Sequence, residues 1–300
     1  MSFVEDALKF HAEHNGMLAV ASKVPLNNRE DLALAYTPGV AEPCKAIKEN
    51  KELSFEYTCR GNTVAIVSDG TRVLGLGDIG PEAAMPVMEG KAVLFKTFGD
   101  VDAIPICIDT KDPEEIIETV RRLQPTFAGI NLEDFSSPKC YEIEDRLREI
   151  CDIPVFHDDQ HGTAIACLSA VIGALRYVKK DIKDVKVVVN GCGAAGSAIG
   201  RLFVSMGFPN VIMVERVGAL YKGIDAKLDK IQRYLSEVTN PNMEKGTLAE
   251  VAKGADILVG VSGPNLFTKE IIASMADKAI VFGLANPVPE TSYEAAIAAG

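Results

Sequence analysis

The sequence predicts an α/β fold with largely parallel sheets. Short apolar runs rich in Val and Ile alternate with longer amphipathic segments along the whole chain. Such continuous runs are typical of parallel strands that are buried on both faces, and helices between them indicate the α/β class. With 300 residues, the chain is long enough for two ordinary domains. The predicted strands lie at 64–67, 103–108, 127–132, 153–156, 185–189, 211–214, 256–261 and 279–284.

The composition excludes several classes of partner. Lys and Arg number 31 and Asp and Glu 42, so the formal net charge is −11, and no basic run predicts a nucleic-acid partner or an anionic membrane. No apolar stretch reaches the roughly 18 residues that span a bilayer. The N-terminus carries acids and histidines instead of a basic start and an apolar block, so it does not predict a secretory signal.

The seven cysteines are scattered along the chain, and none lies in a CxxC pair. We therefore expect free, reduced thiols in a cytoplasmic protein. A zinc site or a disulfide framework is the alternative.

We expect the first domain over residues 1–162. A polar helix near 3–14 comes first, and NTVAIVSDGTRVLGLG (62–77) predicts a hairpin with Asp69-Gly70 as its tight turn. A helix over 81–98 follows. Three strand-then-helix steps complete the domain, and the helix of the last step, GTAIACLSAVIGALRYVKK, bridges into the second domain.

The second domain, expected over residues 163–300, opens with a glycine fingerprint that follows one predicted strand and begins a helix. This is the context of a Rossmann-type dinucleotide-binding turn. The first glycine permits the tight turn, the second lets the backbone approach a pyrophosphate, and the third lets helix and strand pack closely. The free N–H groups of the helix then favour the phosphates; a purely structural turn is the alternative. The residues expected to bind the cofactor are Gly191, Gly193, Ala194, Ala195 and Gly196.

A second match to the glycine pattern, at Gly75, Gly77 and Gly80, lacks this context. It follows a hairpin strand, and no acid ends a following strand at the right distance. We expect these glycines to serve packing or a substrate loop.

Glu215 ends the next predicted strand, 24 residues after Gly191. A carboxylate at that place accepts hydrogen bonds from the ribose 2′-hydroxyl and repels a 2′-phosphate, which favours NAD. The neighbouring Arg216 could instead pair with the 2′-phosphate of NADP, so both cofactors stay open.

Two pairs of acids, Glu133-Asp134 and Asp158-Asp159, end two short apolar strands. The helix predicted between them makes a strand–helix–strand unit with parallel strands, so both pairs emerge at the carboxyl edge of the sheet, where ligands bind. Clustered acids raise one another's pKa, and a hard cation such as Mg²⁺ or Mn²⁺ relieves the repulsion. The alternative is that one pair only caps a following helix.

Four further polar residues have two interpretations each. His157 and His161 stand four apart, but the segment is expected to leave a strand into a turn, so structural histidines are favoured over zinc ligands. Lys91, in the apolar segment PVMEGKAVLF, either reaches solvent or is buried beside a carboxylate with a lowered pKa. Tyr36, before a Pro-Gly break, is either a half-buried tyrosine or a functional one.

Several of these motifs resemble those of the malic enzyme family, in the family's order and over residues 16–298. INLED and FHDDQHGTA are the most specific, and the glycine fingerprint is shared with many dehydrogenases. The other motifs are AYTPGVAEPC, GLGDIG, PVMEGKAVLFK and GLANP. The short N-terminus is similar to that of the small prokaryotic-type branch.

The resemblance implies an N-terminal malic domain, an NAD(P)-binding domain and a homodimer. It implies the oxidative decarboxylation of L-malate to pyruvate and CO₂, with hydride transfer to NAD(P)⁺ and a divalent metal. The matched positions are Glu133, Asp134 and Asp159 for the metal, Lys91 as general base, Asp158 as the acid that contacts this lysine, Tyr36 as general acid, Arg72 for a substrate carboxylate, and Asn286 near the substrate and nicotinamide.

Family members usually continue beyond this point, so we expect a C-terminally shortened dinucleotide domain. Three rival functions stay open: a metal-assisted oxaloacetate decarboxylase, a non-catalytic dinucleotide-sensing module, and an amino-acid or 2-hydroxy-acid dehydrogenase with the same two-domain plan. The clustered acids argue against the last, because a simple hydride transfer needs no such metal site.

Overall fold

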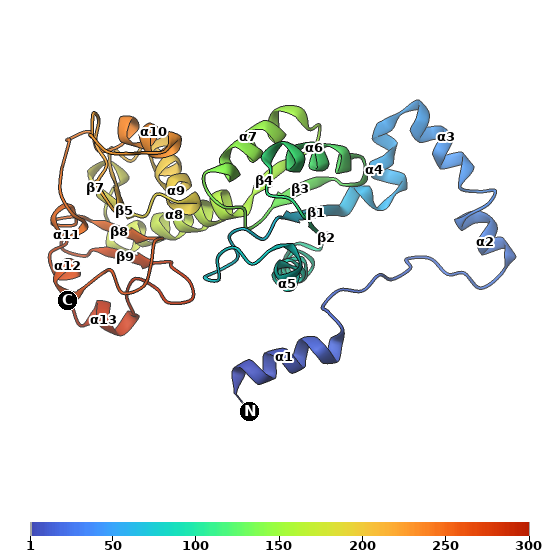
Figure 1. Cartoon of the computed structure of the whole chain (residues 1–300), viewed down its shortest axis with the longest axis horizontal. Helices are drawn as coiled ribbons and strands as arrows, with labels where there is room; N and C mark the ends of the chain where they lie inside the picture. The colour runs from blue at the N-terminus through green and yellow to red at the C-terminus, as the bar shows by residue number, and fades with distance from the viewer. Residues whose placement is uncertain (1, 300) are drawn as a thin grey trace. The chain divides into compact units, whose positions relative to one another are not determined.

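The computed structural model describes residues 2–299, which form two compact units, each built around one sheet (Figure 1). The first unit contains the chain up to residue 73, 78–135 and 143–156, and the second contains 74–77, 136–142 and the chain from 157 onward. The predicted α/β class is confirmed by both sheets. The domain boundary expected after residue 162 stays a prediction.

The first sheet has four strands in the order β2-β1-β3-β4. Strand β1 pairs in parallel with both β2 and β3, so its apolar sequence TVAIVS lies in the middle of the sheet. The strands are β1 Thr63–Ser68, β2 Asp102–Cys107, β3 Gly129–Leu132 and β4 Val155–His157. Apart from the elements described below, this part of the chain forms η1 Lys51–Leu53, α4 Ser54–Tyr57, η2 Cys59–Asn62, α6 Pro113–Leu123, η3 Gln124–Thr126 and α7 Lys139–Ile150.

The hairpin expected at 62–77 is wrong. Strand β1 already has a parallel partner on each side, so the chain that follows has no edge of β1 with which to pair. The chain still bends at Gly70, which has φ +68°, and a Cβ there would lie 2.2 Å from the carbonyl oxygen of Gly80. This close approach requires glycine.

The helix expected at 81–98 is confirmed as α5, Pro81–Gly99. Its residues Ala84, Met88 and Ala92 recur at intervals of four, the spacing of one helix face. They are buried together with Ile66 of β1 and Ala103 of β2. The face of α5 that carries them therefore packs on the sheet.

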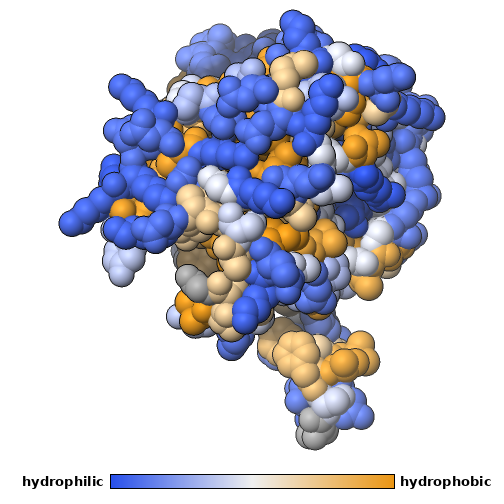
Figure 2. Space-filling model, turned by 90° about the vertical axis from the view of Figure 1, so that its left-hand side faces the viewer, coloured by the Kyte–Doolittle hydropathy of each residue, from blue (hydrophilic) through white to orange (hydrophobic). Residues whose placement is uncertain are grey.

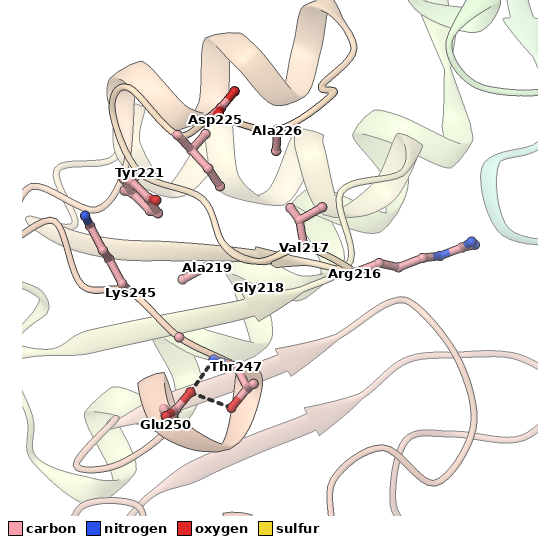
Figure 3. A pocket seen from close by; sticks show the side chains of 12 residues that line it. Arg216, Val217, Gly218, Ala219, Tyr221, Asp225, Ala226, Lys245, Thr247 and Glu250 are labelled. Atoms are coloured by element: carbon pink, nitrogen blue, oxygen red, sulfur yellow. Dashed lines mark hydrogen bonds between the residues drawn. The ribbon is translucent and has the colours of Figure 1, made fainter.

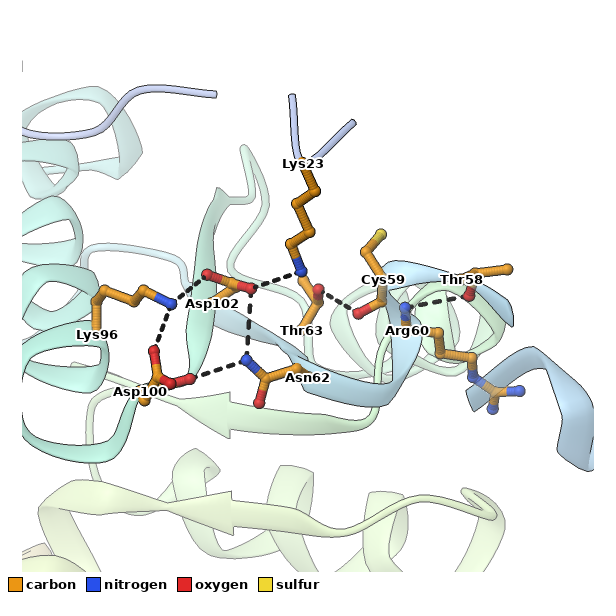
Figure 4. Close-up of polar contacts among 9 residues, drawn as sticks. All are labelled: Lys23, Thr58, Cys59, Arg60, Asn62, Thr63, Lys96, Asp100 and Asp102. Atoms are coloured by element: carbon orange, nitrogen blue, oxygen red, sulfur yellow. Dashed lines mark hydrogen bonds and ion pairs between the residues drawn. The ribbon is translucent and has the colours of Figure 1, made fainter. Parts of the chain in front are cut away.

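An N-terminal arm of three helices precedes the first sheet: α1 Phe3–His14, α2 Arg29–Ala35 and α3 Ala41–Glu49. None of these helices has a buried residue. The Met17 amide donates to Glu89 of α5 at 3.0 Å, and Lys23 lies 3.8 Å from Asp102 of β2 (Figure 4). A hydrogen bond from Lys96 lowers the pKa of this aspartate. Polar contacts of this kind attach the stretch after α1 to α5 and β2.

The second sheet has five strands in the order β7-β6-β5-β8-β9 and is parallel except for the two-residue β7. Val187 and Val189 of β5 share a core with α8, α9 and α10, whereas Val188 shares one with α11 and α12. Both faces are thus buried, as expected for a Rossmann-type sheet. The strands are β5 Lys186–Asn190, β6 Asn210–Glu215, β7 Gly218–Ala219, β8 Ile257–Gly260 and β9 Ile280–Gly283. The helices are α8 Asp158–Val178, η4 Ile182–Asp184, α9 Ala194–Ser205, α10 Lys230–Val238, α11 Leu248–Val251, α12 Lys269–Ala273 and α13 Tyr293–Ile297.

Helix α8 is the one helix of the described chain that could cross a membrane by length and composition. The expectation that no stretch is long enough is wrong in this respect. A helix in the core of a protein can have the same length and composition as a membrane-spanning helix. Cys167, Val171 and Leu175 of α8 belong to the core of the second unit. The face shown in Figure 2 is mostly hydrophilic, with hydrophobic residues in small patches.

Candidate functional site

Acidic side chains follow β3 and β4, which are neighbours in the first sheet. Glu133-Asp134 come directly after β3, and Asp158-Asp159 begin α8 directly after β4. Among residues 2–299, Glu133, Asp134 and Asp159 form a group that could hold a metal, since one ligand oxygen from each lies within 4.8 Å of the others. Three carboxylate oxygens suit a hard cation such as Mg²⁺ or Mn²⁺ and leave positions for water and substrate.

Lys91 stands beside this group. Its Nζ atom lies 3.0 Å from Oε1 of Glu133, and only 22% of the lysine side chain and 7% of the glutamate side chain are exposed. Asn131 Nδ2 donates to the other oxygen of Glu133 at 2.9 Å. Of its two interpretations, the structure favours the one in which Lys91 is largely buried beside a carboxylate.

A chain of polar contacts within the second unit ends on Asp159. Arg201 Nη2 donates to Gln160 Oε1 at 3.0 Å. A guanidinium has only donors, so it fixes the Gln160 amide with Nε2 facing Nδ1 of His157 at 2.9 Å. Nδ1 then accepts, and the ring proton lies on Nε2, which is 3.0 Å from Asp159 Oδ2. These contacts fix the histidine tautomer and place the Nε2 proton 3.0 Å from an oxygen of a candidate metal ligand.

The structural interpretation of His157 agrees with these contacts, since its ring is completely buried. The turn expected after β4 is wrong, because α8 begins at Asp158 with His157 as its N-cap. Asp158 folds over the next turn of α8: a Cβ at Gly162 would lie 2.1 Å from Asp158 Oδ1. The glycine of the FHDDQHGTA motif therefore makes room for this carboxylate.

Arg72 and Tyr36 are both exposed. Arg72 lies in the loop after β1, and its amide donates to the carbonyl of Asp134 at 2.9 Å. Tyr36 ends α2, and 68% of it is exposed. Figure 1 shows α2 well apart from α5, which carries Lys91. Within one chain, the structure does not bring Tyr36 and Lys91 together.

The glycine fingerprint lies between β5 and α9, and its three glycines differ in surroundings as expected. Gly191 has φ +112°. A Cβ at Gly193 would meet nothing within 4 Å, so the backbone there is open to a ligand. A Cβ at Gly196 would lie 1.8 Å from the Gly191 carbonyl, so only glycine allows this close packing. Ala194 and Ala195 begin α9, whose first turn has no side-chain cap, and its N–H groups can bind phosphate.

Glu215 ends β6 beside this turn. Its carboxylate accepts hydrogen bonds from the amides of Cys192 at 3.2 Å and Arg216 at 3.1 Å. The side chain is therefore held at the carboxyl edge of the sheet, next to the glycine turn. Burial, with smaller contributions from Glu215 and Asp229, raises the pKa of the Cys192 thiol.

A cavity of about 480 Å³ lies along the β6–β7 hairpin (Figure 3). Arg216, next to Glu215, lies at one end of the cavity. Lys245 lies at the other, with its Nζ 4.6 Å from the centre of the Tyr221 ring. Figure 3 shows the two cations pointing away from each other, so they do not form one anion site.

Asn286 lies in the exposed loop after β9. Four polar residues that contact predicted site residues or their neighbours were not predicted from the sequence: Gln160, Arg201, Ser262 and Glu290. Gln160 stands inside the FHDDQHGTA motif, and Glu290 follows the GLANP motif by three residues. Nothing in the sequence marks Arg201 or Ser262, because their partners lie 41 and 72 residues away.

Comparisons with known proteins agree with this geometry. The family model described as "Malic enzyme, N-terminal domain" matches residues 15–148, and the model described as "Malic enzyme, NAD binding domain" matches residues 160–299. The "Bifunctional malic/malolactic enzyme" of Bacillus subtilis is 49% identical over 100% of this chain and 73% of its own length. The "NAD-dependent malic enzyme" of Geobacillus stearothermophilus is 52% identical over 94% of this chain, which spans 59% of that relative.

Solved structures give the same result. The crystal structure of the NAD-dependent malic enzyme from Thermotoga maritima has a TM-score of 0.95 and 48% identity, covering 98% of this chain and 78% of that one. The malic enzyme of Pyrococcus horikoshii has a TM-score of 0.93 and 46% identity, covering 100% and 72%. Among the curated relatives compared by sequence, the "NADP-dependent malic enzyme" of Escherichia coli is 46% identical, and this chain spans 38% of its length.

Proposed function

Because this chain belongs to the malic enzyme family, we propose that it oxidises and decarboxylates L-malate to pyruvate and CO₂ while reducing NAD⁺ or NADP⁺. The observation that carries the proposal is Lys91 Nζ at 3.0 Å from Glu133, a carboxylate of the acidic group. This arrangement supports a reaction in which Lys91, once deprotonated, accepts a proton beside the metal. Relatives named as NAD-dependent and NADP-dependent malic enzymes agree with this proposal.

Glu133, Asp134 and Asp159 would hold the divalent metal, Mg²⁺ or Mn²⁺. The fit rests on the chemistry of the donor set: three carboxylates with oxygens inside a 4.8 Å group. A metal bound there acts as a Lewis acid and stabilises the negative charge that develops when CO₂ leaves. It also offsets the mutual repulsion of the three acids.

The chain's own residues move the protons. Lys91 accepts the proton of the malate C2 hydroxyl as the hydride leaves C2 for the nicotinamide. The bond between C3 and the C4 carboxylate then breaks, CO₂ leaves, and C3 receives a proton from the Tyr36 hydroxyl. Arg72 and Asn286 bind the substrate, and Asp158 matches the acid that contacts the lysine in the family's motif. These roles are carried over from the family's motifs, residue by residue.

The functional unit would be a homodimer. The N-terminal arm exposes a series of large apolar side chains that nothing in its own chain covers: Phe3, Val4, Leu8, Val20, Leu26, Leu34 and Tyr36 are 63–100% exposed. Burial of this surface against a second copy would stabilise the arm. Tyr36 would then lie beside the reacting groups of the second copy, since its own chain does not bring these groups near it.

NAD is the favoured dinucleotide, bound on Gly191, Gly193, Ala194, Ala195 and Gly196. Glu215, held between two backbone amides, would accept from the ribose 2′-hydroxyl and repel a 2′-phosphate.

The enzyme would work in the cytoplasm. All seven cysteines lie in the described chain as free thiols, which suits a reducing compartment.

The test is NAD(P)H formation by the purified chain with L-malate and Mn²⁺, before and after addition of a chelator. Equal amounts of NADH and pyruvate, lost with the chelator, would support the proposal. Lactate in place of pyruvate, without net NADH, would indicate the malolactic reaction in the Bacillus subtilis relative's name. Absence of turnover while the dinucleotide still binds would contradict the proposal and favour the non-catalytic module.

A further inference from the structure

Glu290 is a completely buried carboxylate in the second unit. Its partners are backbone amides from two separate loops. Oε1 accepts from Ser262 at 2.8 Å and from Gly263 at 3.4 Å, in the loop after β8. Oε2 accepts from Ala285 at 3.0 Å, in the loop after β9. A buried charge is costly unless it is hydrogen-bonded, so these amides stabilise the carboxylate in place.

Glycines at two strand ends leave room for Glu290. Gly260 ends β8 and Gly283 ends β9, and the two residues are register partners in the sheet. A Cβ at Gly260 would lie 2.4 Å from Cδ of Glu290, and one at Gly283 would lie 3.3 Å from its amide nitrogen. Any larger residue at Gly260 would displace the carboxylate.

One of the two loops reaches the glycine fingerprint. The hydroxyl of Ser262 accepts a hydrogen bond from Nδ2 of Asn190 at 2.8 Å, and a Cβ at Gly191 would lie 3.0 Å from the Cβ of Ser262. The other loop carries Asn286, directly after the amide of Ala285 that Glu290 binds. The strands β5, β8 and β9 are parallel, so all three segments lie at the carboxyl edge of one sheet, where ligands bind.

We propose that Glu290 is a positioning residue that fixes the loop after β8 against the glycine turn and the loop after β9 beside it. Both loops are thereby set for the dinucleotide, and Asn286 is set for the substrate. A carboxylate is required because both of its oxygens accept, one from each loop. A glutamine could accept for one loop only, and its NH₂ group would face an amide donor of the other. The inference rests on the proposed function only in its assignment of Asn286 to the substrate.

The experiment compares Glu290→Gln and Ser262→Ala with wild type, with Glu294→Gln as the matched control at an exposed position of α13. NADH affinity is measured by fluorescence without malate or metal, then kcat and KM with malate, and the melting temperature. We expect Glu290→Gln to weaken NADH binding about 10-fold and to lower kcat about 10-fold or more. Ser262→Ala, which keeps the amide for Glu290 but loses the link to Asn190, should weaken NADH binding about 3-fold with little change in melting temperature.

NADH affinity and kcat equal to those of wild type in Glu290→Gln, with only a lower melting temperature, would overturn the proposal in favour of a purely structural role. If Glu290→Gln does not fold, wild-type NADH affinity in Ser262→Ala overturns it, and weakened affinity supports it. A wild type that binds NADH without turning over malate contradicts the proposed reaction alone, since the binding comparison still decides the role of Glu290. A wild type that binds no NADH overturns both.

Discussion

The Nε2 atom of His157 lies 3.0 Å from Oδ2 of Asp159, two residues further along the chain. The amide of Gln160 contacts the other ring nitrogen, Nδ1, and Arg201 in turn donates to Gln160, so these two residues set the orientation of the buried ring. A candidate metal ligand is thus oriented by a guanidinium on α9, although no sequence motif joins the two. Mutation of such outer partners typically lowers metal affinity or activity roughly 10–100-fold.

Gln160→Met removes the amide from this chain while nearly preserving side-chain length. The proton of His157 is then no longer fixed on Nε2, and we expect Mn²⁺ affinity to fall about 10-fold. Titration of free Mn²⁺ by electron paramagnetic resonance measures the change. Gln232→Met, the same substitution in the cap of α10, serves as the control. Equal Mn²⁺ affinity in the two variants would show that the chain does not support the metal ligand.

Lys91→Met should lower malate oxidation about 10³-fold while NADH still binds, because we propose Lys91 as the general base and such a group contributes roughly 10²–10⁴-fold. The matched control is Lys96→Met on the same helix, which loses only contacts to Asp100 and Asp102 and should keep its activity. Steady-state kinetics with both variants decide the matter. If Lys91→Met retained a tenth of wild-type kcat, another group would have to accept the proton.

Glu215→Ser removes the carboxylate that would read the ribose. We expect the ratio of kcat/KM for NADP⁺ over NAD⁺ to rise about 10-fold, since repulsion of the 2′-phosphate is lost and Arg216 can pair with it. Arg216→Ala in the same background should reverse the gain. An unchanged ratio in Glu215→Ser would show that the acid only ties β6 to the glycine turn.

Leu34→Asp places a charge at a position of the arm that is 72% exposed. On a free surface this change would matter little, but within an interface it buries an unpaired charge. We expect the proposed homodimer to dissociate at least about 10-fold more readily, as sedimentation equilibrium would show. Lys48→Asp on α3 adds an acid at another exposed place of the arm and is the control. A wild-type chain that sediments as a monomer would refute the dimer itself.

Thiol reactivity should separate the cysteines sharply. Burial raises the pKa of Cys167 to about 12 and also raises that of Cys192, so neither forms its reactive thiolate at pH 8. Cys44 and Cys59 are exposed. We expect iodoacetamide to alkylate this exposed pair first, as peptide mass spectrometry would report.

The raised pKa of Cys167 also makes the free energy of unfolding depend on pH. A raised folded-state pKa favours the neutral thiol, so the contribution of Cys167 is complete below its ordinary pKa of 9.0 and is lost as pH rises toward about 12. Cys167→Ala should therefore lose less stability than wild type between these two pH values, as denaturant unfolding would measure. Identical alkaline slopes would show that the Cys167 thiol does not contribute.

Much of the fold follows from local pattern, and much of the site's support does not. Val187, Val188 and Val189 predict a strand buried on both faces, and Gly191 to Gly196 predict the turn after it. The hairpin predicted at Asp69-Gly70 is wrong because β1 has a parallel partner on each side, and the local sequence does not show this pairing. Arg201 and Ser262 had no local signal, since each acts on a residue far away in sequence.

The short strand β7 has a consequence for how the second sheet meets other proteins. An exposed sheet edge is a template for pairing with another chain. Here the edge beside β6 is only Gly218–Ala219 long, and the Ala219 amide already donates to the carbonyl of Gly246 at 2.8 Å. A foreign strand finds little unpaired backbone on that side. The loop that carries Gly246 accepts this hydrogen bond but is not itself a strand. The sheet therefore offers little unpaired backbone at this edge to an aggregating chain.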